Sequence, residues 1–266
     1  MTDAAPASGS AIPVVEWSAT GQQTFAIQLG HPPVNALSSA LLDGLDAALD
    51  EFDRSSARVV VIASAVPGFF AAGADIKTMA NIDRDGFVAY GKHVRSVIER
   101  LAALDRPSIA AIEGRALGGG MELALACSLR VVGTAAQFGL PEAKIGLIPS
   151  AGGTQRLPRY VGRGRALDLM LTARSVGGDE ALRIGLADRV VPEGQARESA
   201  LALAAQLASL SRSALRDVIR CVDNSFDLPL EQGLAEEVSR VEGLFDGPDG
   251  LEGMRAFLEK RPPRFS

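Results

Sequence analysis

Short apolar segments recur along most of the chain at the spacing of β-strands. Residues 25–29 alternate between apolar and polar, as a half-buried strand does. The runs 58–63, 107–112 and 129–132 are nearly continuous and rich in branched side chains, which is typical of strands buried on both faces. Helical patterns separate them up to about Val191. Strands that alternate with helices predict the α/β class.

The clearest helical pattern begins near Ser38. A serine side chain at Ser38 or Ser39 can accept a hydrogen bond from the first turn and so begin the helix. Further helices are expected over 85–104 and from the glycines at 118–120 through Cys127. One face of the first helix would carry five apolar residues, Leu41, Leu45, Ala48, Leu49 and Phe52.

The character of the chain changes at both ends. Small and polar residues dominate positions 1–12, which predicts a disordered tail. The alternating core is expected at 13–195. A helical C-terminal subdomain is expected at 196–266, because only helical patterns follow there, over 197–210, 212–222, 230–245 and 251–260.

Composition and charge argue against several functional classes of protein. The chain has 266 residues, 47% of them hydrophobic, which is enough for a sizeable core. Its net charge of −5 argues against a general nucleic-acid binder, which needs a basic field. No Lys or Arg precedes Arg54 and no apolar run approaches about 18 residues, so we expect neither a secretory signal nor a membrane span. Two cysteines, read as buried free thiols, fit a cytoplasmic location.

Two glutamates flank a glycine-rich turn and carry the most specific chemistry. Glu122 would lie in the first turn of the helix that follows Gly118–Gly120, among apolar neighbours. A carboxylate in such surroundings demands a functional reason. Glu142 precedes the apolar, glycine-rich stretch 145–154, which is typical of a pocket wall. Paired carboxylates can move a proton and activate a water molecule, although either could also be an ordinary helix-start carboxylate.

Backbone donors accompany these carboxylates. The turn at 118–120 opens a helix, whose first N–H groups are unpaired and attract negative charge. The small-residue turn at 69–75 follows another buried strand, so each turn could give one N–H to the same developing oxyanion. Neither GxxxxGK[ST] nor a GxGxxG after a strand occurs, which makes a nucleotide site a weak alternative. His31 and His93 have no evident partners, so we expect no metal site.

Four segments together resemble the crotonase (enoyl-CoA hydratase/isomerase) superfamily, from about Val14 to Phe265. They are Ala-Ala-Gly-Ala-Asp-Ile-Lys at 71–77, Gly-Gly-Gly-Met-Glu at 118–122, the Pro-Glu at 141–142 with Ala-Gly-Gly-Thr-Gln-Arg-Leu at 151–157, and Gly-Met-Arg-Ala-Phe-Leu-Glu-Lys-Arg at 253–261. The resemblance implies a spiral of ββα units followed by a helical trimerisation region. It also implies a homotrimer or a dimer of trimers.

The resemblance assigns roles to particular residues. Glu122 and Glu142 match the two catalytic glutamates of hydratases, and the N–H groups of Ala74 and Gly119 match the oxyanion hole. No metal and no cofactor are implied, because coenzyme A is part of the acyl-CoA thioester substrate. Residues matching the acyl-CoA site are Ala74, Asp75, Ile76, Lys77, Gly119, Phe257 and Lys260, the last two in a neighbouring subunit.

The expected activity is that of an enoyl-CoA hydratase, which adds water syn to a trans-2-enoyl-CoA and gives a 3-hydroxyacyl-CoA. One alternative is a Δ3-Δ2-enoyl-CoA isomerase, which needs only one well-placed base. Another is a 3-methylglutaconyl-CoA hydratase. A non-enzymatic RNA-binding or scaffold protein on the same fold is disfavoured by the retained carboxylates and the negative net charge.

Overall fold

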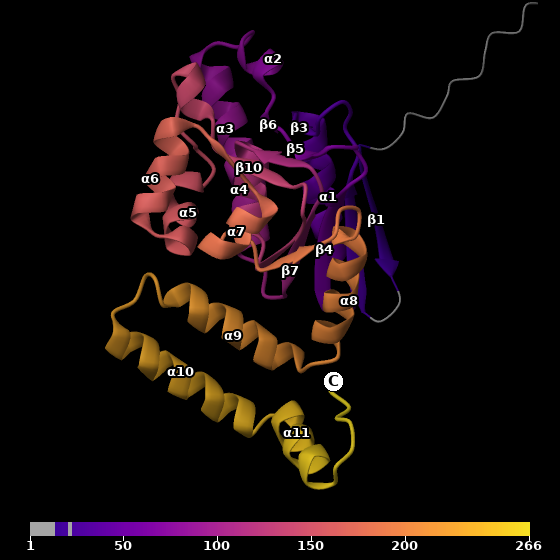
Figure 1. Ribbon diagram of the computed structural model, residues 1–266. Coiled ribbons are helices and arrows are strands. Elements are labelled where there is room, and N and C mark those ends of the chain that lie inside the picture. Colours follow the sequence, from indigo (N-terminus) through magenta and orange to yellow (C-terminus); the bar gives the residue numbers. More distant parts are fainter. Residues whose placement is uncertain (1–13, 21–22) are drawn as a thin grey trace, which may run out of the picture.

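The computed structural model describes residues 14–20 and 23–266 (Figure 1). The disordered tail expected at 1–12 lies outside the described residues. The strands are β1 Val15–Thr20, β2 Thr24–Leu29, β3 Ala36–Leu37, β4 Val59–Ser64, β5 Phe69–Ala71, β6 Gly73–Ala74, β7 Ser108–Ile112, β8 Arg115–Leu117, β9 Leu129–Gly133, β10 Gln137–Gly139, β11 Ser175–Gly177 and β12 Arg189–Val191.

Helices cover the strands and continue beyond them. They are α1 Ser39–Arg54, α2 Ile76–Met79, α3 Arg84–Ala102, α4 Gly119–Ala126, the short 3-10 helix η1 Glu142–Ile145, α5 Gly153–Val161, α6 Arg163–Thr172, α7 Gly178–Ile184, α8 Ala196–Ala208, α9 Arg212–Asn224, α10 Leu230–Phe245 and α11 Pro248–Leu258. The described part of the chain contains no helix with the length and apolar character needed to cross a membrane.

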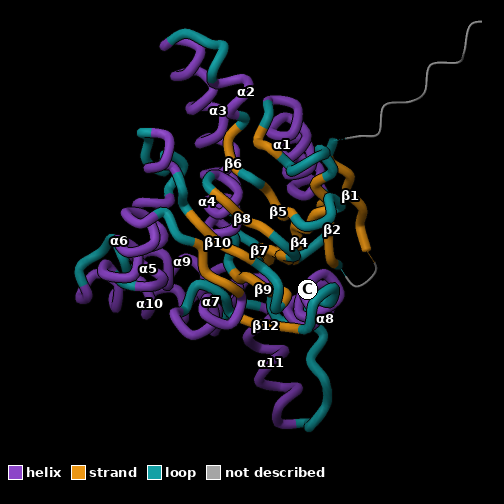
Figure 2. The backbone as a smooth tube through the Cα atoms, turned by 45° about the horizontal axis from the view of Figure 1, so that its top comes forward, coloured by secondary structure: helices purple, strands orange, loops and turns teal. Residues whose placement is uncertain are grey.

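Successive strand pairs wind between two sheets. The larger sheet has the order β1-β2-β4-β7-β9-β12, and the smaller one has the order β11-β10-β8-β5. The pairs β4/β5, β7/β8 and β9/β10 each place one strand in each sheet before the chain turns into helix. Neighbours are parallel except at β1–β2 and β10–β11. This winding, visible in Figure 2, confirms the α/β class and the spiral of ββα units.

The central strands of the larger sheet are buried on both faces. Val60 and Ile62 of β4 face the main core, whereas Val59 and Val61 face a second core built with α8. This alternation explains why the strand reads as a continuous apolar run in the sequence. The runs at 58–63, 107–112 and 129–132 therefore fold as β4, β7 and β9 as predicted.

Helix α1 also forms where the pattern placed it. All five predicted apolar residues are buried, and the Ser38 side chain accepts a hydrogen bond from Leu41 N at 3.3 Å. Two other segments differ from expectation. Residues 69–75, predicted as a turn, contain the short strands β5 and β6. The sequence does not predict β1, because only its first residue, Val15, is buried.

The helical C-terminal region begins with a helix that packs on the core. Helix α8 contacts the larger sheet through Ala200, Leu203 and Ala204. It therefore covers a face of the core, although it lies within the residues 196–266 that we expect as the C-terminal subdomain. Helices α9 and α10 run side by side below the core, and α11 follows them (Figure 1). These three helices expose many apolar side chains.

Candidate active site

The glycine turn before α4 has a backbone that only glycine adopts readily. Gly118 has φ +51° and lies between β8 and α4. A Cβ at Gly120 would overlap the carbonyl group of Ala71 on β5, so α4 packs tightly against that strand. The helix is buried along its whole length, Gly119 to Ala126. The turn therefore holds the first N–H groups of α4 at a fixed place.

The second small-residue turn lies directly against the first one. A Cβ at Gly73 would stand 2.8 Å from Leu117 O and 3.1 Å from Gly119 N. A Cβ at Gly119 would stand 3.7 Å from Ala74 N. The structure thus brings together the two backbone segments that carry the predicted oxyanion donors.

Glu122 is held in place by backbone donors. Its side chain is 3% exposed, and Oε1 accepts hydrogen bonds from Ala151 N at 2.7 Å and Gly153 N at 2.8 Å. Burial raises the pKa of the Glu122 carboxyl, while these two N–H groups and the nearby Arg156 oppose the rise. One oxygen is thus fixed, and the carboxyl group is set in a dry environment.

Glu142 begins η1 and is only partly buried. A Cβ built on Gly118 would lie 3.0 Å from Oε1 of Glu142, so this carboxyl group lies over the glycine turn. Its Oε2 is buried without a hydrogen-bond partner among the described residues. The pKa of Glu142 is raised to about 7, chiefly by burial and also by the charge of Glu122, while a hydrogen bond from its own backbone opposes the rise. At neutral pH this group can therefore give or take a proton.

The arrangement suits proton transfer beside a polarised carbonyl. Two carboxyl groups in dissimilar surroundings are the usual sign of an acid and base pair. Backbone donors at the start of a buried helix can stabilise negative charge that develops on an oxygen. A buried carboxyl oxygen without a protein partner leaves an acceptor for water or for a substrate group.

The predicted acyl-CoA residues fall into two places. Asp75 caps α2 through hydrogen bonds from Lys77 N at 3.1 Å and Thr78 N at 3.2 Å, directly after Ala74, a predicted oxyanion donor. Phe257 is 83% exposed and lies in α11, with Lys260 just beyond that helix. Figures 1 and 2 show α11 and α2 at opposite ends of the molecule, so one chain does not bring these groups together.

The remaining polar groups read from the sequence have structural partners. His31 Nδ1 lies 3.0 Å from Ser38 Oγ, and His93 Nε2 lies 3.3 Å from Asp43. Cys127 is buried as expected, whereas Cys221 is only partly buried. Among the residues that the structure describes, no group of three or more potential ligands is arranged to hold a metal ion.

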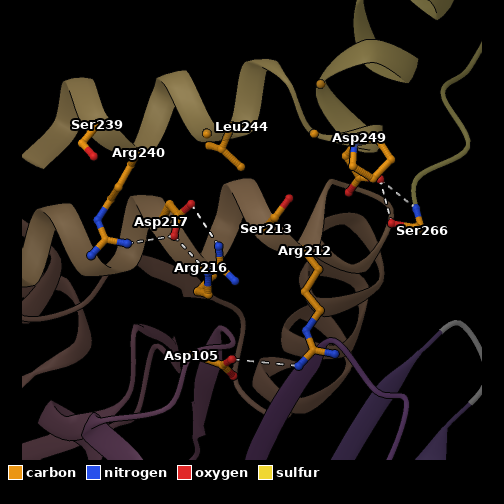
Figure 3. A pocket seen from close by; sticks show the side chains of 14 residues that line it. Asp105, Arg212, Ser213, Arg216, Asp217, Ser239, Arg240, Leu244, Asp249 and Ser266 are labelled. Carbon is orange, nitrogen blue, oxygen red and sulfur yellow. Dashed lines mark hydrogen bonds and ion pairs between the residues drawn. The ribbon is translucent and has the colours of Figure 1, made fainter.

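A cavity of about 660 Å³ with several charged side chains in its lining lies apart from the glutamates, among α9, α10 and α11 (Figure 3). Its charged groups pair with one another. Asp217 accepts from Arg216 at 2.9 Å and from Arg240 at 3.1 Å, and Arg212 lies 4.0 Å from Asp105. The Arg216 guanidinium lowers the pKa of Asp217. These ion pairs tie α9 to α10 and to the core, a structural role.

The sequence did not reveal the two backbone N–H groups that hold the Glu122 carboxyl group, those of Ala151 and Gly153. The stretch was predicted as a pocket wall, not as the support of Glu122. The available signal was Gly152, which has φ +107° and precedes α5, because a glycine before a helix exposes the first N–H groups of that helix.

Comparisons with known proteins all point to one protein family. Residues 20–266 match the family model described as Enoyl-CoA hydratase/isomerase. The chain is 40% identical over 252 residues to the Mycobacterium leprae protein named "Probable enoyl-CoA hydratase echA8", with 92% of this chain and 95% of that protein covered. It is 42% identical over 236 residues to mitochondrial methylglutaconyl-CoA hydratase of Mus musculus, with 87% and 75% covered.

A solved structure agrees in three dimensions. The crystal structure of enoyl-CoA hydratase from Bacillus anthracis superposes with a TM-score of 0.91 at 37% sequence identity. The match covers 95% of this chain and 98% of that chain. The similarity therefore includes the C-terminal helices as well as the spiral core.

Proposed function

The chain belongs to the enoyl-CoA hydratase/isomerase family, and on this basis we propose that it adds water to a trans-2-enoyl-CoA to give a 3-hydroxyacyl-CoA. One observation carries the proposal. Two carboxyl groups, Glu122 and Glu142, lie beside the junction of the two backbone turns that contain Ala74 and Gly119. An oxyanion site with one base would serve several reactions, whereas a second carboxyl group favours addition of water.

The proposed reaction uses each group once. The N–H groups of Ala74 and Gly119 polarise the thioester carbonyl, which makes C3 electrophilic and stabilises the enolate-like transition state. Water oxygen bonds to C3 as Glu122 takes its proton, and Glu142 gives a proton to C2 on the same face. The acid has a pKa of about 7, close to the neutral range in which such a group works best. No cofactor takes part, because coenzyme A enters with the substrate.

We propose that the exposed C-terminal helices join copies of this chain into a homotrimer or a dimer of trimers. Exposed apolar residues recur at helical spacing on α10, as in Leu234, Val238 and Val241, each more than half exposed. Assembly would also explain why Phe257 and Lys260 lie far from α2, since they could reach the acyl-CoA of a neighbouring copy.

The free cysteines fit a reducing cytoplasm, which we propose as the compartment.

A 3-methylglutaconyl-CoA hydratase is the second candidate. The observation that favours it is the 42% identity to the mouse protein of that name. Both candidates use the same two carboxyl groups and differ in the acyl chain that the site accepts. A Δ3-Δ2-enoyl-CoA isomerase fits less well, because it leaves one of the glutamates without a task.

A panel of enoyl-CoA thioesters tests the proposed function. Purified protein is mixed with crotonyl-CoA, longer enoyl-CoAs, 3-methylglutaconyl-CoA and a 3-enoyl-CoA, and the conjugated enoyl absorbance is followed. Hydration removes that absorbance, whereas isomerisation of the 3-enoyl-CoA creates it. We expect loss of absorbance with at least one 2-enoyl-CoA. If the protein hydrates none of the 2-enoyl-CoAs in the panel, the proposal is refuted.

A further inference from the structure

The hydroxyl group of Tyr90 on α3 joins two strands that meet at the oxyanion site. It accepts a hydrogen bond from Asp75 N at 3.0 Å and donates one to Leu37 O at 2.7 Å. The direction of both bonds is fixed, because an N–H can only donate and a carbonyl oxygen can only accept. Burial raises the pKa of Tyr90, so the hydroxyl group keeps the proton that it donates at neutral pH.

The strands that it joins are very short. β3 and β6 pair in parallel over two residues each, with Leu37 opposite Ala74. Before Ala74, the chain is anchored by a hydrogen bond of 3.0 Å from Ala72 N to Val34 O. After Ala74, the next N–H, that of Asp75, goes to Tyr90. The hydroxyl group thus anchors the second side of the residue that carries one oxyanion donor.

The same hydroxyl group also acts on the other donor segment. A Cβ built on Gly119 would lie 2.8 Å from Leu37 Cδ1, so the Leu37 side chain lies directly against Gly119. Leu37 is fully buried and cannot move away without opening the core. A group that holds the Leu37 carbonyl therefore also limits how the turn before α4 can shift.

We propose that Tyr90 is a positioning residue of the oxyanion hole, which fixes the spacing between the N–H groups of Ala74 and Gly119 through Asp75 and Leu37. The inference rests on the proposed function of this site. Small displacements of donors reduce transition-state stabilisation much more than substrate binding, because the developing charge is localised on one oxygen. Tyr90 touches no reacting atom in this scheme.

The test removes one oxygen atom, that of the Tyr90 hydroxyl group. Tyr90→Phe removes both hydrogen bonds and keeps the ring. Tyr160→Phe is the matched control, because Tyr160 is the chain's other tyrosine and donates a single hydrogen bond of 3.3 Å to Leu125 O at the far end of α4. With crotonyl-CoA we expect Tyr90→Phe to lower kcat about 10-fold and to change KM less than about 3-fold. Tyr160→Phe should leave kcat within about 2-fold of the parent.

A spectroscopic measurement separates positioning from folding. Cinnamoyl-CoA bound at the site should absorb at longer wavelength than in water, because the N–H groups polarise its conjugated carbonyl. We expect Tyr90→Phe to stay folded, as shown by a cooperative thermal unfolding transition, and to bind cinnamoyl-CoA with a smaller red shift. Unchanged kcat and red shift in Tyr90→Phe, a loss confined to KM, or an equal loss in Tyr160→Phe would overturn the proposal. If the parent protein shows the red shift but hydrates nothing, the proposed function fails and the red shift still tests Tyr90.

Discussion

The carboxyl group of Glu142 lies where a side chain on Gly118 would point in the candidate active site. A Cβ added at Gly118 would stand 3.0 Å from Oε1 of Glu142, which is tighter than nine in ten contacts of real Cβ atoms. The glycine turn and the second glutamate are thus parts of one surface, although 24 positions separate them in the sequence (142 − 118). The absence of a side chain at Gly118 leaves room for the carboxyl group.

Replacement of Gly118 by alanine should therefore damage catalysis beyond its effect on stability. The backbone at Gly118 has φ +51°, so alanine adds strain there as well as a methyl group beside Glu142. We expect kcat/KM for crotonyl-CoA to fall at least about 10-fold. The measurement is steady-state hydration followed by loss of enoyl absorbance.

Gly162 provides the matched control for this substitution. It has φ +80°, yet a Cβ there would meet nothing within 4 Å. Gly162→Ala should cost stability of the same order, about 1–3 kcal/mol, with activity per folded molecule retained. Equal losses of activity in the two variants would show that backbone strain, not the contact with Glu142, is responsible.

The raised pKa of Glu142 should appear in the pH dependence of stability. Its pKa is about 7 in the folded protein against 4.5 ordinarily, so the folded state binds the proton more tightly. This contribution to the free energy of unfolding is present below the unfolded pKa and is lost as pH rises through about 7. The Glu142→Gln variant has no carboxyl group at this position, so it does not lose this stability as the pH rises. The full shift corresponds to about 3 kcal/mol, and solvent screening of this partly exposed group lowers the expected rise in the variant's stability relative to the parent to about 2 kcal/mol between about pH 4 and about pH 8.

Chemical denaturation of both proteins across this range checks that value. The titrations of other groups largely cancel in the difference between two proteins that differ at one residue. A difference in unfolding free energy that stays constant with pH would contradict the raised pKa.

The sequence predicted the parts of this molecule that depend on side-chain pattern. Buried strands such as β4 follow from their apolar runs, and Glu122 stood out as a carboxylate among apolar neighbours. It did not predict β6, because a two-residue strand has no period and exists only through its pairing with β3. Nor did it predict the donors of Ala151 and Gly153 to Glu122, because every residue except proline carries a backbone N–H.

The exposed face of α10 should control assembly. Leu234→Asp places a charge in the apolar surface that we propose as the subunit interface, where an unpaired charge costs several kcal/mol. We expect the parent to sediment as a trimer or hexamer and this variant to dissociate. Leu171→Asp on α6 is the control, because Leu171 is 75% exposed outside that face. A monomeric parent, or equal dissociation of both variants, would disprove the interface.

The most direct test of the central claim is the hydration rate of crotonyl-CoA by Glu122→Gln and Glu142→Gln. Glutamine keeps the shape of each side chain but removes its proton chemistry, and general acid–base catalysis contributes about 10²–10⁴-fold. Glu51→Gln, on an exposed part of α1, serves as the control. We predict that kcat/KM falls at least about 100-fold in each active-site variant and stays at the parent value in the control. Parent-like hydration in either Glu122→Gln or Glu142→Gln would contradict the account.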